Sequence, residues 1–567
     1  MRIRSDSYRG RLWHIPEPHE HEAVPGTPYP DFVNKLLWRR GIRTASQAQV
    51  FLFDQPYTLP DAALLPGMEA AIERILRAVG DDETVSVYGD FDVDGITSVT
   101  ILTEAIRAAG GRASAYIPDR FSEGYGLNRE ALSELRGRGV DLVITADCGI
   151  TSIAEVDFAN EIGLDVVIVD HHSVPAETPD AYATVNPKVP GSAYPFSELS
   201  TGGLAYRIAH LLLERRGLSV GADRWLDLAA LSTVADVVPL VEDNRWIVSN
   251  GLDAIRETTR PGLRALLDVS GLWGQELDAD SIAFGLAPRL NAAGRLDHAL
   301  RAVELLTETD PDRAAAQAQE LDSLNVQRRQ LTLDAMERGA ARLADEDADL
   351  PITFIGDPGI PTGIVGLVAG RLAEERHRPA FVYEEGPEWC RASCRSIPEF
   401  DIAAALRECD DLLERHGGHH MAAGFTVRRE NIAPLKERLS ALAQAQLAEV
   451  VLKPRIEVDG QVPLSRVSGS QVEWLQRMAP FGAGNPAPTF VSTSVRVLEA
   501  KRVGSDKSHL RLRVQDGGQV WSGIGFGLGG TPVRTGDAVD MIWSLKRNGR
   551  FGGVELEARD LAPATAG

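Results

Sequence analysis

Residues 84–95 read TVSVYGDFDVDG, a short apolar run that ends in three alternating aspartates and a glycine. The β-branched residues of this run predict a buried strand. Two further runs have the same form, LVITADCG at 142–149 and DVVIVDHH at 165–172, and Asp236 closes a fourth, LSTVA at 231–235. Each run therefore predicts a buried strand with an acidic group at its carboxyl end.

Helical stretches alternate with these strands. The predicted helices span residues 97–109, 129–137, 153–162 and 204–215. Buried strands separated by helices are typical of a parallel, doubly wound α/β sheet. Such a sheet binds its ligands outside the carboxyl ends of its strands. We therefore expect the four acidic sites to meet at one edge of the sheet.

The chain is too long for a single hydrophobic core. It has 567 residues, 44% hydrophobic and 25% charged, so three or four soluble globular domains are expected. No run approaches the roughly 20 apolar residues of a membrane span, and the N-terminus has no apolar signal core behind it. Four cysteines are too few for a disulfide framework, which favours a cytoplasmic location. Cys390 and Cys394 lack the second pair that a zinc site needs.

The net charge of −22 argues against a protein that coats duplex DNA through its overall field. It does not exclude binding of nucleic acid in a local basic groove. Carboxylates that bind metal ions would also account for part of this charge.

Composition divides the chain into five segments. The expected segments are a lead-in at 1–80 that packs on the domain after it, an α/β domain with the four acidic sites at 81–296, a helical connector at 297–350, a smaller α/β domain at 351–452 and a small β-barrel at 453–567, for which the oligonucleotide-binding (OB) type is one option. The connector is rich in Ala, Leu, Gln, Arg and Glu, which favours one long helix. In the smaller domain we expect a helix at 402–415. Short alternating strands with Gly-rich turns predict the barrel.

The alternation of Asp90, Asp92 and Asp94 predicts a cation site. If this segment is extended, the three carboxylates share one face of the chain and repel one another, and hard cations relieve such repulsion. Two ions about 3.5–4 Å apart are then expected, as in two-metal hydrolases. The further ligands expected at this edge are Asp147, His171 and Asp236. Mixed carboxylate and imidazole ligation favours Mn²⁺, with Mg²⁺ as the alternative.

A calcium loop is the main alternative for this segment. DFDVDG at 90–95 matches the first half of an EF-hand loop, which ends in a glutamate six positions after its glycine. Ile101 occupies that position here. The buried strand before the segment also argues against an EF-hand.

Together these motifs resemble the DHH phosphoesterase superfamily, and within it the bacterial exonucleases that degrade single-stranded DNA from its 5′ end. Further runs that carry the resemblance are IPDR at 117–120, EGYG at 123–126, APRLNAAGR at 287–295, SCRS at 393–396, GGH at 417–419, AAG at 422–424 and PFGAGNP at 480–486. They cover roughly residues 45–562 in family order. The segment at 351–452 resembles the DHH-associated C-terminal domain.

The resemblance implies a two-ion mechanism. The implied metal ligands are Asp90, Asp92, Asp94, Asp147, His171 and Asp236. His172 would contact a phosphate oxygen or transfer a proton, and Asp170 would orient an imidazole ring. The motif does not separate His171 from His172, so the two could exchange roles.

The resemblance also implies a pocket for a terminal 5′ phosphate. The candidate substrate contacts are Arg120, Arg289, Asn291, Ser393 and Arg395, with His419 near the active site. Guanidinium groups suit phosphate oxygens. A passage too narrow for duplex would select single strands by shape.

In the barrel, Lys501, Arg502, Lys507, Arg511 and Arg513 form a basic stretch that would extend the path of the strand. Phe481, Phe490 and Trp521 could stack on bases, although a place in the core is the more usual one for each.

The hypothesis from sequence is a metal-dependent, single-strand-specific 5′→3′ DNA exonuclease that releases 5′-mononucleotides in recombination and repair. The alternatives are a DHH-type oligoribonuclease or dinucleotide phosphodiesterase, an inactive replication scaffold and, more weakly, an inorganic pyrophosphatase. The family suggests a single-strand binding protein and a RecQ-type helicase as partners, beside single-stranded DNA. We expect a monomer that does not bind membranes.

Overall fold

The computed structural model describes residues 2–17, 22–219, 221, 223–346, 350–504, 506–547 and 553–565. The chain forms two compact units, each built from segments that are separate in sequence. Unit 1 comprises Met1–Tyr116, Gly126–Ala287 and Pro454–Gly567, and unit 2 comprises Ile117–Tyr125 and Pro288–Lys453. The chain therefore passes repeatedly between the two units.

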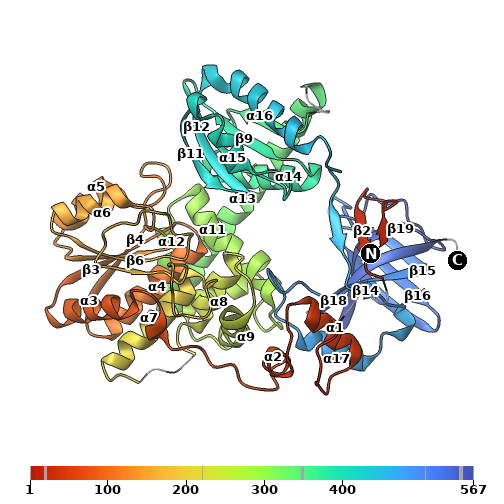
Figure 1. The fold of residues 1–567 in the computed structure, drawn as a ribbon, viewed down its shortest axis with the longest axis horizontal. Coiled ribbons are helices and arrows are strands. Elements are labelled where there is room, and N and C mark those ends of the chain that lie inside the picture. The colour runs from red at the N-terminus through yellow and green to blue at the C-terminus, as the bar shows by residue number, and fades with distance from the viewer. Residues whose placement is uncertain are drawn as a thin grey trace. The chain divides into compact units, whose positions relative to one another are not determined.

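The centre of unit 1 is a five-stranded sheet in which all neighbouring strands are parallel, in the order β4-β3-β5-β6-β7 (Figure 1). Its strands are β3 (Thr84–Gly89), β4 (Arg112–Tyr116), β5 (Leu142–Ala146), β6 (Asp165–Val169) and β7 (Ala183–Val185). Every residue of β5 is buried, as a strand covered on both faces requires. The predicted α/β fold with a parallel sheet is confirmed.

Helices cover both faces of this sheet (Figure 1). Helices α5 and α6 lie on one face, and α3, α4 and α7 lie on the other. Their bounds are α3 (Met68–Gly80), α4 (Val93–Ala108), α5 (Arg129–Gly137), α6 (Ile153–Glu161) and α7 (Thr201–Arg215). Leu132, Leu135 and Val156 pack with Val143 and Val166 of the sheet in one hydrophobic cluster. Burial of these apolar side chains is the main force that holds the layers together.

The strand predicted at 231–235 is wrong, because these residues end helix α8 (Leu226–Ala235). Nine of the ten residues of α8 are buried, so the helix is buried on all sides. A short apolar run of this kind has no periodicity that separates a buried helix from a buried strand. Helices α9 (Glu242–Arg256), α10 (Pro261–Val269) and α11 (Ala287–Leu296) follow.

The C-terminal part of unit 1 is a closed barrel. Its five main strands follow the order β15-β16-β17-β19-β18, and β18 pairs back to β15. The bounds are β14 (Gly460–Gln461), β15 (Thr489–Val503), β16 (His509–Asp516), β17 (Gln519–Gly525), β18 (Ala538–Arg547) and β19 (Val554–Pro563), with α17 (Gly469–Arg477) before β15. The predicted OB-type barrel is confirmed. Phe490 lies in its core, with Phe481 and Trp521 half-buried against it.

The lead-in differs from its predicted packing. Strand β2 (Leu12–Ile15) pairs with β1 (Arg2–Arg4) and with β13 (Arg455–Glu457), beside the barrel. Side chains from α1 (Asp31–Arg39) and α2 (Ala45–Phe51) join the hydrophobic core of the barrel. The last part of the lead-in contacts the catalytic domain: α3 packs against β7 and α7, Tyr57 donates a hydrogen bond to Asp243, and Arg207 donates one to the Pro60 carbonyl. The amphipathic pattern of α1 predicts a buried face but not the partner of that face.

Unit 2 contains a second sheet with the order β11-β12-β10-β9-β8, in which only β8 and β9 are parallel. Its elements are α12 (Leu300–Thr307), α13 (Pro311–Glu346), β8 (Thr353–Asp357), α14 (Thr362–Arg376), β9 (Ala380–Glu385), β10 (Trp389–Arg395), α15 (Ile402–Arg407), β11 (Leu413–His419), β12 (Ala422–Arg428) and α16 (Ile432–Leu447). The connector predicted at 297–350 is helical but consists of two helices, α12 and α13, separated at residues 308–310. Its residues 347–349 lie outside the described part of the chain. The helix predicted at 402–415 ends at Arg407, and residues 413–419 form edge strand β11 instead.

No helix among the described residues combines the length and hydrophobicity needed to cross a bilayer.

Candidate metal centre

The first acidic segment turns from β3 into α4. Asp92 is the N-cap of α4, and its Oδ1 accepts hydrogen bonds from the amides of Asp94 (3.0 Å) and Gly95 (3.2 Å). A Cβ at Gly95 would lie 2.4 Å from the Asp90 carbonyl oxygen, so only glycine fits this corner. The predicted extended segment with three carboxylates on one face is wrong, because α4 begins at Val93. Asp94 therefore lies in the first helical turn.

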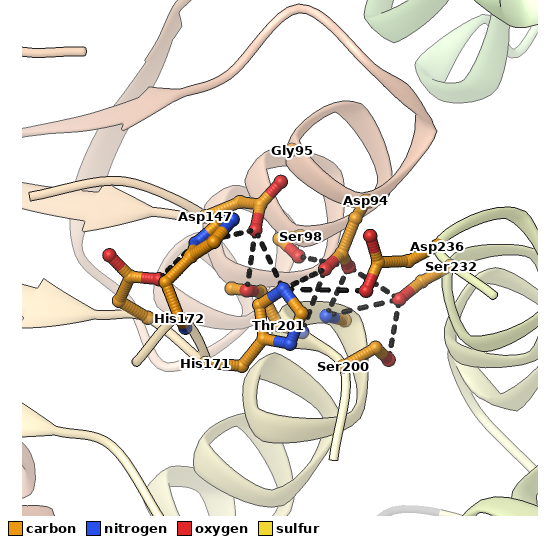
Figure 2. A network of polar contacts seen from close by, with 12 residues as sticks. Asp94, Gly95, Ser98, Asp147, His171, His172, Ser200, Thr201, Ser232 and Asp236 are labelled. Atoms are coloured by element: carbon orange, nitrogen blue, oxygen red, sulfur yellow. Dashed lines mark hydrogen bonds and ion pairs between the residues drawn. The ribbon is translucent and has the colours of Figure 1, made fainter. Parts of the chain in front are cut away.

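Asp94 is buried against the N-terminus of α7. Its carboxylate accepts hydrogen bonds from the amides of Thr201 (2.9 Å) and Gly202 (2.7 Å) and from the Ser232 hydroxyl (2.5 Å) (Figure 2). Free amides and the helix dipole stabilise a carboxylate at such a position. No motif in the sequence marks Thr201, Gly202 or Ser232 as residues of the site. Ser200, a capping residue before a helical run, does indicate that a helix begins here with free amides.

Asp147 follows β5 in a left-handed conformation, with a φ of 68°. This backbone is unusual for a residue with a side chain and is found at functional sites. Thr201 Oγ1 donates a hydrogen bond of 3.1 Å to the Asp147 carboxylate. Burial, together with the negative charges of Asp94 and the other aspartates, raises the pKa of Asp147 well above its ordinary value. A cation beside this carboxylate would stabilise its ionised form.

His171 lies among the carboxylates (Figure 2). Its Nε2 is 3.3 Å from Asp147 Oδ1, 3.3 Å from Asp236 Oδ2 and 3.8 Å from Asp94 Oδ2. The ring is buried, and neither nitrogen forms a hydrogen bond within the described chain. Burial lowers the pKa of His171, which favours the neutral imidazole that binds metals. A buried nitrogen without a donor or acceptor, facing three carboxylates, fits a metal ligand.

His172 has a different partner. Its Nδ1 is 2.7 Å from Asp170 Oδ1, and its amide donates to the same oxygen at 3.0 Å. Burial alone lowers the pKa of His172, but the Asp170 carboxylate outweighs it and raises that pKa to about 9. Asp170 is itself buried, and it accepts a further hydrogen bond from the Ile150 amide (3.1 Å). Despite burial, its bond with His172 holds the pKa of Asp170 below the ordinary value.

Asp236 completes the cluster from the C-terminal end of α8 (Figure 2). Burial and then the charge of Asp94 raise the pKa of Asp236 to about 8. The metal-free site therefore carries more carboxylates than it can keep ionised.

Three sets of side chains bring their ligand atoms within 4.8 Å of one another. These sets are Asp147 with His171 and His172, Asp94 with His171 and Asp236, and Asp90 with Asp92 and Asp147. Because the sets share Asp147 and His171, they form one continuous cluster at the carboxyl edge of the sheet. All six residues predicted as metal ligands belong to it.

The predicted substrate contacts all lie in unit 2, whereas the metal cluster lies in unit 1. Arg289 and Asn291 lie on α11, and Arg289 Nε donates to Asp322 Oδ1 at 2.8 Å. Arg120 Nη1 donates to the Gly294 carbonyl at 3.4 Å, near the same helix. These three residues therefore gather around α11.

Ser393 and Arg395 form a second group on β10. Arg395 Nη1 donates to Ser393 Oγ at 3.1 Å. A Cβ at Gly366 of α14 would lie 3.0 Å from Ser393 Oγ and 3.3 Å from Arg395 Nη2, so this glycine leaves room beside both polar groups. His419 is exposed at the end of β11.

Three family descriptions match the chain. The DHH family N-terminal domain matches residues 84–233, the DHHA1 domain matches 349–445 and the RecJ OB domain matches 458–559. The single-stranded-DNA-specific exonuclease RecJ of Dickeya dadantii is 35% identical over 522 residues, which are 88% of this chain and 89% of that protein. The chain belongs to the RecJ family. The RecJ exonuclease of Bacillus subtilis is also 35% identical, over 91% of this chain, but the chain spans only 66% of its length.

Solved RecJ structures agree with this assignment. RecJ from Thermus thermophilus in complex with Mn²⁺ has a TM-score of 0.81 and 28% identity, covering 98% of this chain and 80% of that one. The same enzyme in complex with Mg²⁺ has a TM-score of 0.76 and 27% identity. The chain is thus a metal-dependent nuclease of the RecJ family, and the expectation of Mn²⁺ or Mg²⁺ as cofactor is confirmed.

Proposed function

We propose that this RecJ family member is a 5′→3′ exonuclease that hydrolyses single-stranded DNA to 5′-mononucleotides and acts in DNA recombination and repair. The observation that carries the proposal is the continuous cluster of carboxylates around His171 at the carboxyl edge of a parallel sheet. We infer single-stranded DNA as the substrate because both relatives are named single-stranded-DNA-specific exonucleases.

The six clustered side chains would hold two cations. The proposed ligands are Asp90, Asp92, Asp94, Asp147, His171 and Asp236. Cations bound there would acidify a water molecule and stabilise negative charge on the phosphate oxygens. Thr201, Gly202 and Ser232 fix the Asp94 carboxylate by three hydrogen bonds. The chain thereby fixes one ligand in position before a cation arrives.

The two histidines would have separate roles. His171 is buried, which lowers its pKa, and it is directed at three carboxylates, so we assign it to the metal. His172 is held by Asp170 through Nδ1, which leaves Nε2 for the substrate. With a pKa of about 9, His172 is protonated at neutral pH and would donate to a phosphate oxygen or to the leaving group.

An exonuclease that degrades DNA in the 5′→3′ direction must recognise the 5′ end of the strand. We assign this to the polar groups of unit 2, which are Arg120, Arg289, Asn291, Ser393, Arg395 and His419. Ser393 and Arg395 offer a hydroxyl and a guanidinium side by side next to Gly366. Burial lowers the pKa of Arg395, and a bound phosphate would supply the negative charge that this buried cation favours.

The barrel would guide the rest of the strand. In the pairing of β15 with β16, Lys501 lies opposite Arg511, and Arg502 and Arg513 lie nearby. Such a basic surface binds phosphates of single strands without sequence preference. The proposed domains of this chain end at residues 80, 296, 350 and 452.

The four cysteines are unpaired thiols, in accordance with a proposed cytoplasmic location. A monomeric state, and a single-strand binding protein and a RecQ-type helicase as partners, remain proposals drawn from the family.

The test is digestion of single-stranded oligonucleotides labelled at the 5′ or the 3′ end, in Mn²⁺ and in EDTA. We expect immediate release of a labelled mononucleotide from the 5′ end, a shortening ladder from the 3′ label, and no reaction in EDTA or on blunt duplex. Asp147→Ala should abolish the reaction. The matched control is Asp157→Ala, which removes an exposed carboxylate from α6 of the same domain.

Two outcomes would overturn the proposal. Survival of long DNA while di- to pentaribonucleotides disappear would identify an oligoribonuclease. No hydrolysis of any substrate by metal-loaded protein would identify a scaffold.

A further inference from the structure

The proposed function leaves the PFGAGNP loop of the barrel, Pro480–Pro486, without a role. In unit 1 this loop contacts the segment that directly follows the proposed metal ligand Asp236. We call this segment, Val237–Val241, the strap. It connects the end of α8 to the start of α9.

The loop and the strap fit closely. The Leu240 amide donates a hydrogen bond of 2.7 Å to the Ala483 carbonyl. A Cβ at Gly484 would lie 2.8 Å from Pro239 Cβ and 3.2 Å from Pro239 Cα, and a Cβ at Gly482 would lie 2.7 Å from Leu240 Cδ1. Gly484 therefore allows the loop to approach the rigid Pro239 ring closely, whereas the contact at Gly482 is with the flexible end of the Leu240 side chain.

The loop itself is held by buried polar groups. Asn485 is fully buried, and its Nδ2 donates to the carbonyls of Met478 (2.9 Å) and Pro480 (2.8 Å). Arg40 Nε donates to Asn485 Oδ1 at 2.9 Å. Arg245, from α9, donates to the carbonyls of Met478 (3.0 Å) and Ala479 (2.8 Å). Loss of any of these bonds would leave a buried polar group unsatisfied, which makes the loop a rigid surface.

The strap is strained and is fixed on its other side as well. Val237 has a φ of 59°, although its side chain is β-branched and 70% exposed. A valine in this conformation is strained and persists only where its surroundings impose it. Asn244 Nδ2 donates to the Pro239 carbonyl at 3.0 Å. Asn244 and the loop together therefore impose the path of the strap.

We propose that the Pro480–Pro486 loop is a positioning element for Asp236, so that the barrel sets the geometry of one metal position in addition to its contact with DNA. The strain at Val237 lies one residue after Asp236, and the loop contacts begin two residues later. Displacement of the strap would move the carboxylate away from His171 Nε2, 3.3 Å distant. This inference rests on the proposed function, since it takes Asp236 as a metal ligand.

The test compares two barrel glycines in the full-length chain. Gly484→Ala places a methyl group against Pro239, whereas Gly536→Ala makes the same change at another left-handed glycine with nothing within 4 Å. Direct titration with Mn²⁺, with free Mn²⁺ counted by electron paramagnetic resonance, measures the affinity of each position without activity. Supporting groups around metal ligands typically contribute 10–100-fold in affinity. We expect Gly484→Ala to weaken one of two Mn²⁺ positions by at least about 10-fold and Gly536→Ala to weaken neither.

A double variant separates positioning from general damage. If the loop acts through Asp236, Gly484→Ala should add little further loss of Mn²⁺ affinity to Asp236→Ala. Equal Mn²⁺ affinity in the wild type, Gly484→Ala and Gly536→Ala would overturn the inference, and so would additive losses. Should Gly484→Ala fail to fold, Gly482→Ala perturbs the same loop–strap contact more mildly, against the end of the Leu240 side chain and without a left-handed backbone. A wild-type chain that binds no Mn²⁺ would instead overturn the proposed function.

Discussion

At the scale of single residues, the metal centre concentrates negative charge that protons must neutralise when no cation is bound. Asp147 and Asp236 both have a raised pKa because they are buried beside other aspartates. Asp94 is stabilised instead by three hydrogen-bond donors. The cluster therefore stores unfavourable electrostatic energy that bound cations would release.

This charge makes the stability of the metal-free protein depend on pH. The pKa of Asp236 is about 8 in the folded chain against an ordinary value of 3.8, so the folded state holds a proton that the unfolded state releases. The free energy of unfolding should then fall as the pH rises from about 4 to about 8. Melting temperatures of the chelated protein at pH 5, 7 and 8.5 measure this, with Asp236→Asn as comparison. We expect a smaller pH dependence in the variant, and parallel curves would contradict this account.

The pairing of Asp170 with His172 gives a second prediction. In Asp170→Asn the carboxylate that raises the pKa of His172 is lost, so that pKa should fall from about 9 towards its ordinary value of 6.5. If protonated His172 assists the reaction, kcat/KM of the variant should decline above about pH 6.5 instead of above about pH 9, with a loss of about 30-fold at pH 8. A pH–rate profile shows the shift. A variant whose profile keeps the wild-type shape at lower amplitude would contradict the role of His172.

At the scale of elements, helices α4, α7 and α8 meet at the metal centre because small side chains allow their close approach. A Cβ at Gly202 of α7 would lie 2.4 Å from both Cβ and Oγ of Ser232 on α8. The contact brings the α7 amides and the Ser232 hydroxyl onto the same carboxylate, that of Asp94 in α4. The close approach of α7 and α8 is thus part of the metal centre.

Gly202→Ala should therefore damage both the fold and the site. Overpacking of this kind costs about 1–3 kcal/mol of the free energy of unfolding, and movement of α7 would also weaken the hydrogen bonds to Asp94. Urea denaturation measures the first effect and Mn²⁺ titration the second. The control is Gly469→Ala in α17, where a Cβ has nothing within 4 Å. Unchanged stability in Gly202→Ala would contradict the packing described here.

The sequence predicted the strands of the catalytic sheet well, since β3, β5 and β6 are apolar runs that stop at an acidic residue. It failed where local pattern does not decide the structure. The apolar run before Asp236 was compatible with a buried strand or a buried helix, and its packing between α4, α7 and α9 decides for helix. Asp94 was placed on a strand because the alternation of aspartates concealed the N-cap at Asp92. Thr201 and Ser232 carry no charge, so only the structure shows that they contact the acidic cluster.

At the scale of the whole molecule, the proposed metal ligands and the proposed contacts to the 5′ end belong to different compact units. Binding of a ligand stabilises the unit that holds it. Cation binding should therefore affect unit 1 directly, whereas a terminal phosphate should first affect unit 2. The metal-ligand and substrate-contact motifs could be recognised from sequence. Their distribution over the two units follows from the path of the chain, which crosses between the units at residues 116–117, 125–126, 287–288 and 453–454.

Hydrogen exchange measured by mass spectrometry tests this division. Addition of Mn²⁺ to the metal-free chain should slow exchange in peptides from β5 and α8, and leave β8–β10 of unit 2 nearly unchanged. At 100 times the dissociation constant, one bound ion contributes about 2.7 kcal/mol. Asp147→Ala serves as the control, because its exchange should respond little to Mn²⁺. Equal protection across both units would contradict the assignment of the ligands to unit 1.

The path of the chain through unit 1 also constrains when this molecule can fold during synthesis. Trp13 donates a hydrogen bond to the buried carboxylate of Asp560, which lies 547 positions later. Strand β2 finds β13 only after all of unit 2 has been made. The first strands to leave the ribosome must therefore wait, with unpaired edges, for nearly the last ones. The barrel and the strands beside it can therefore be completed only after all of unit 2 has been made.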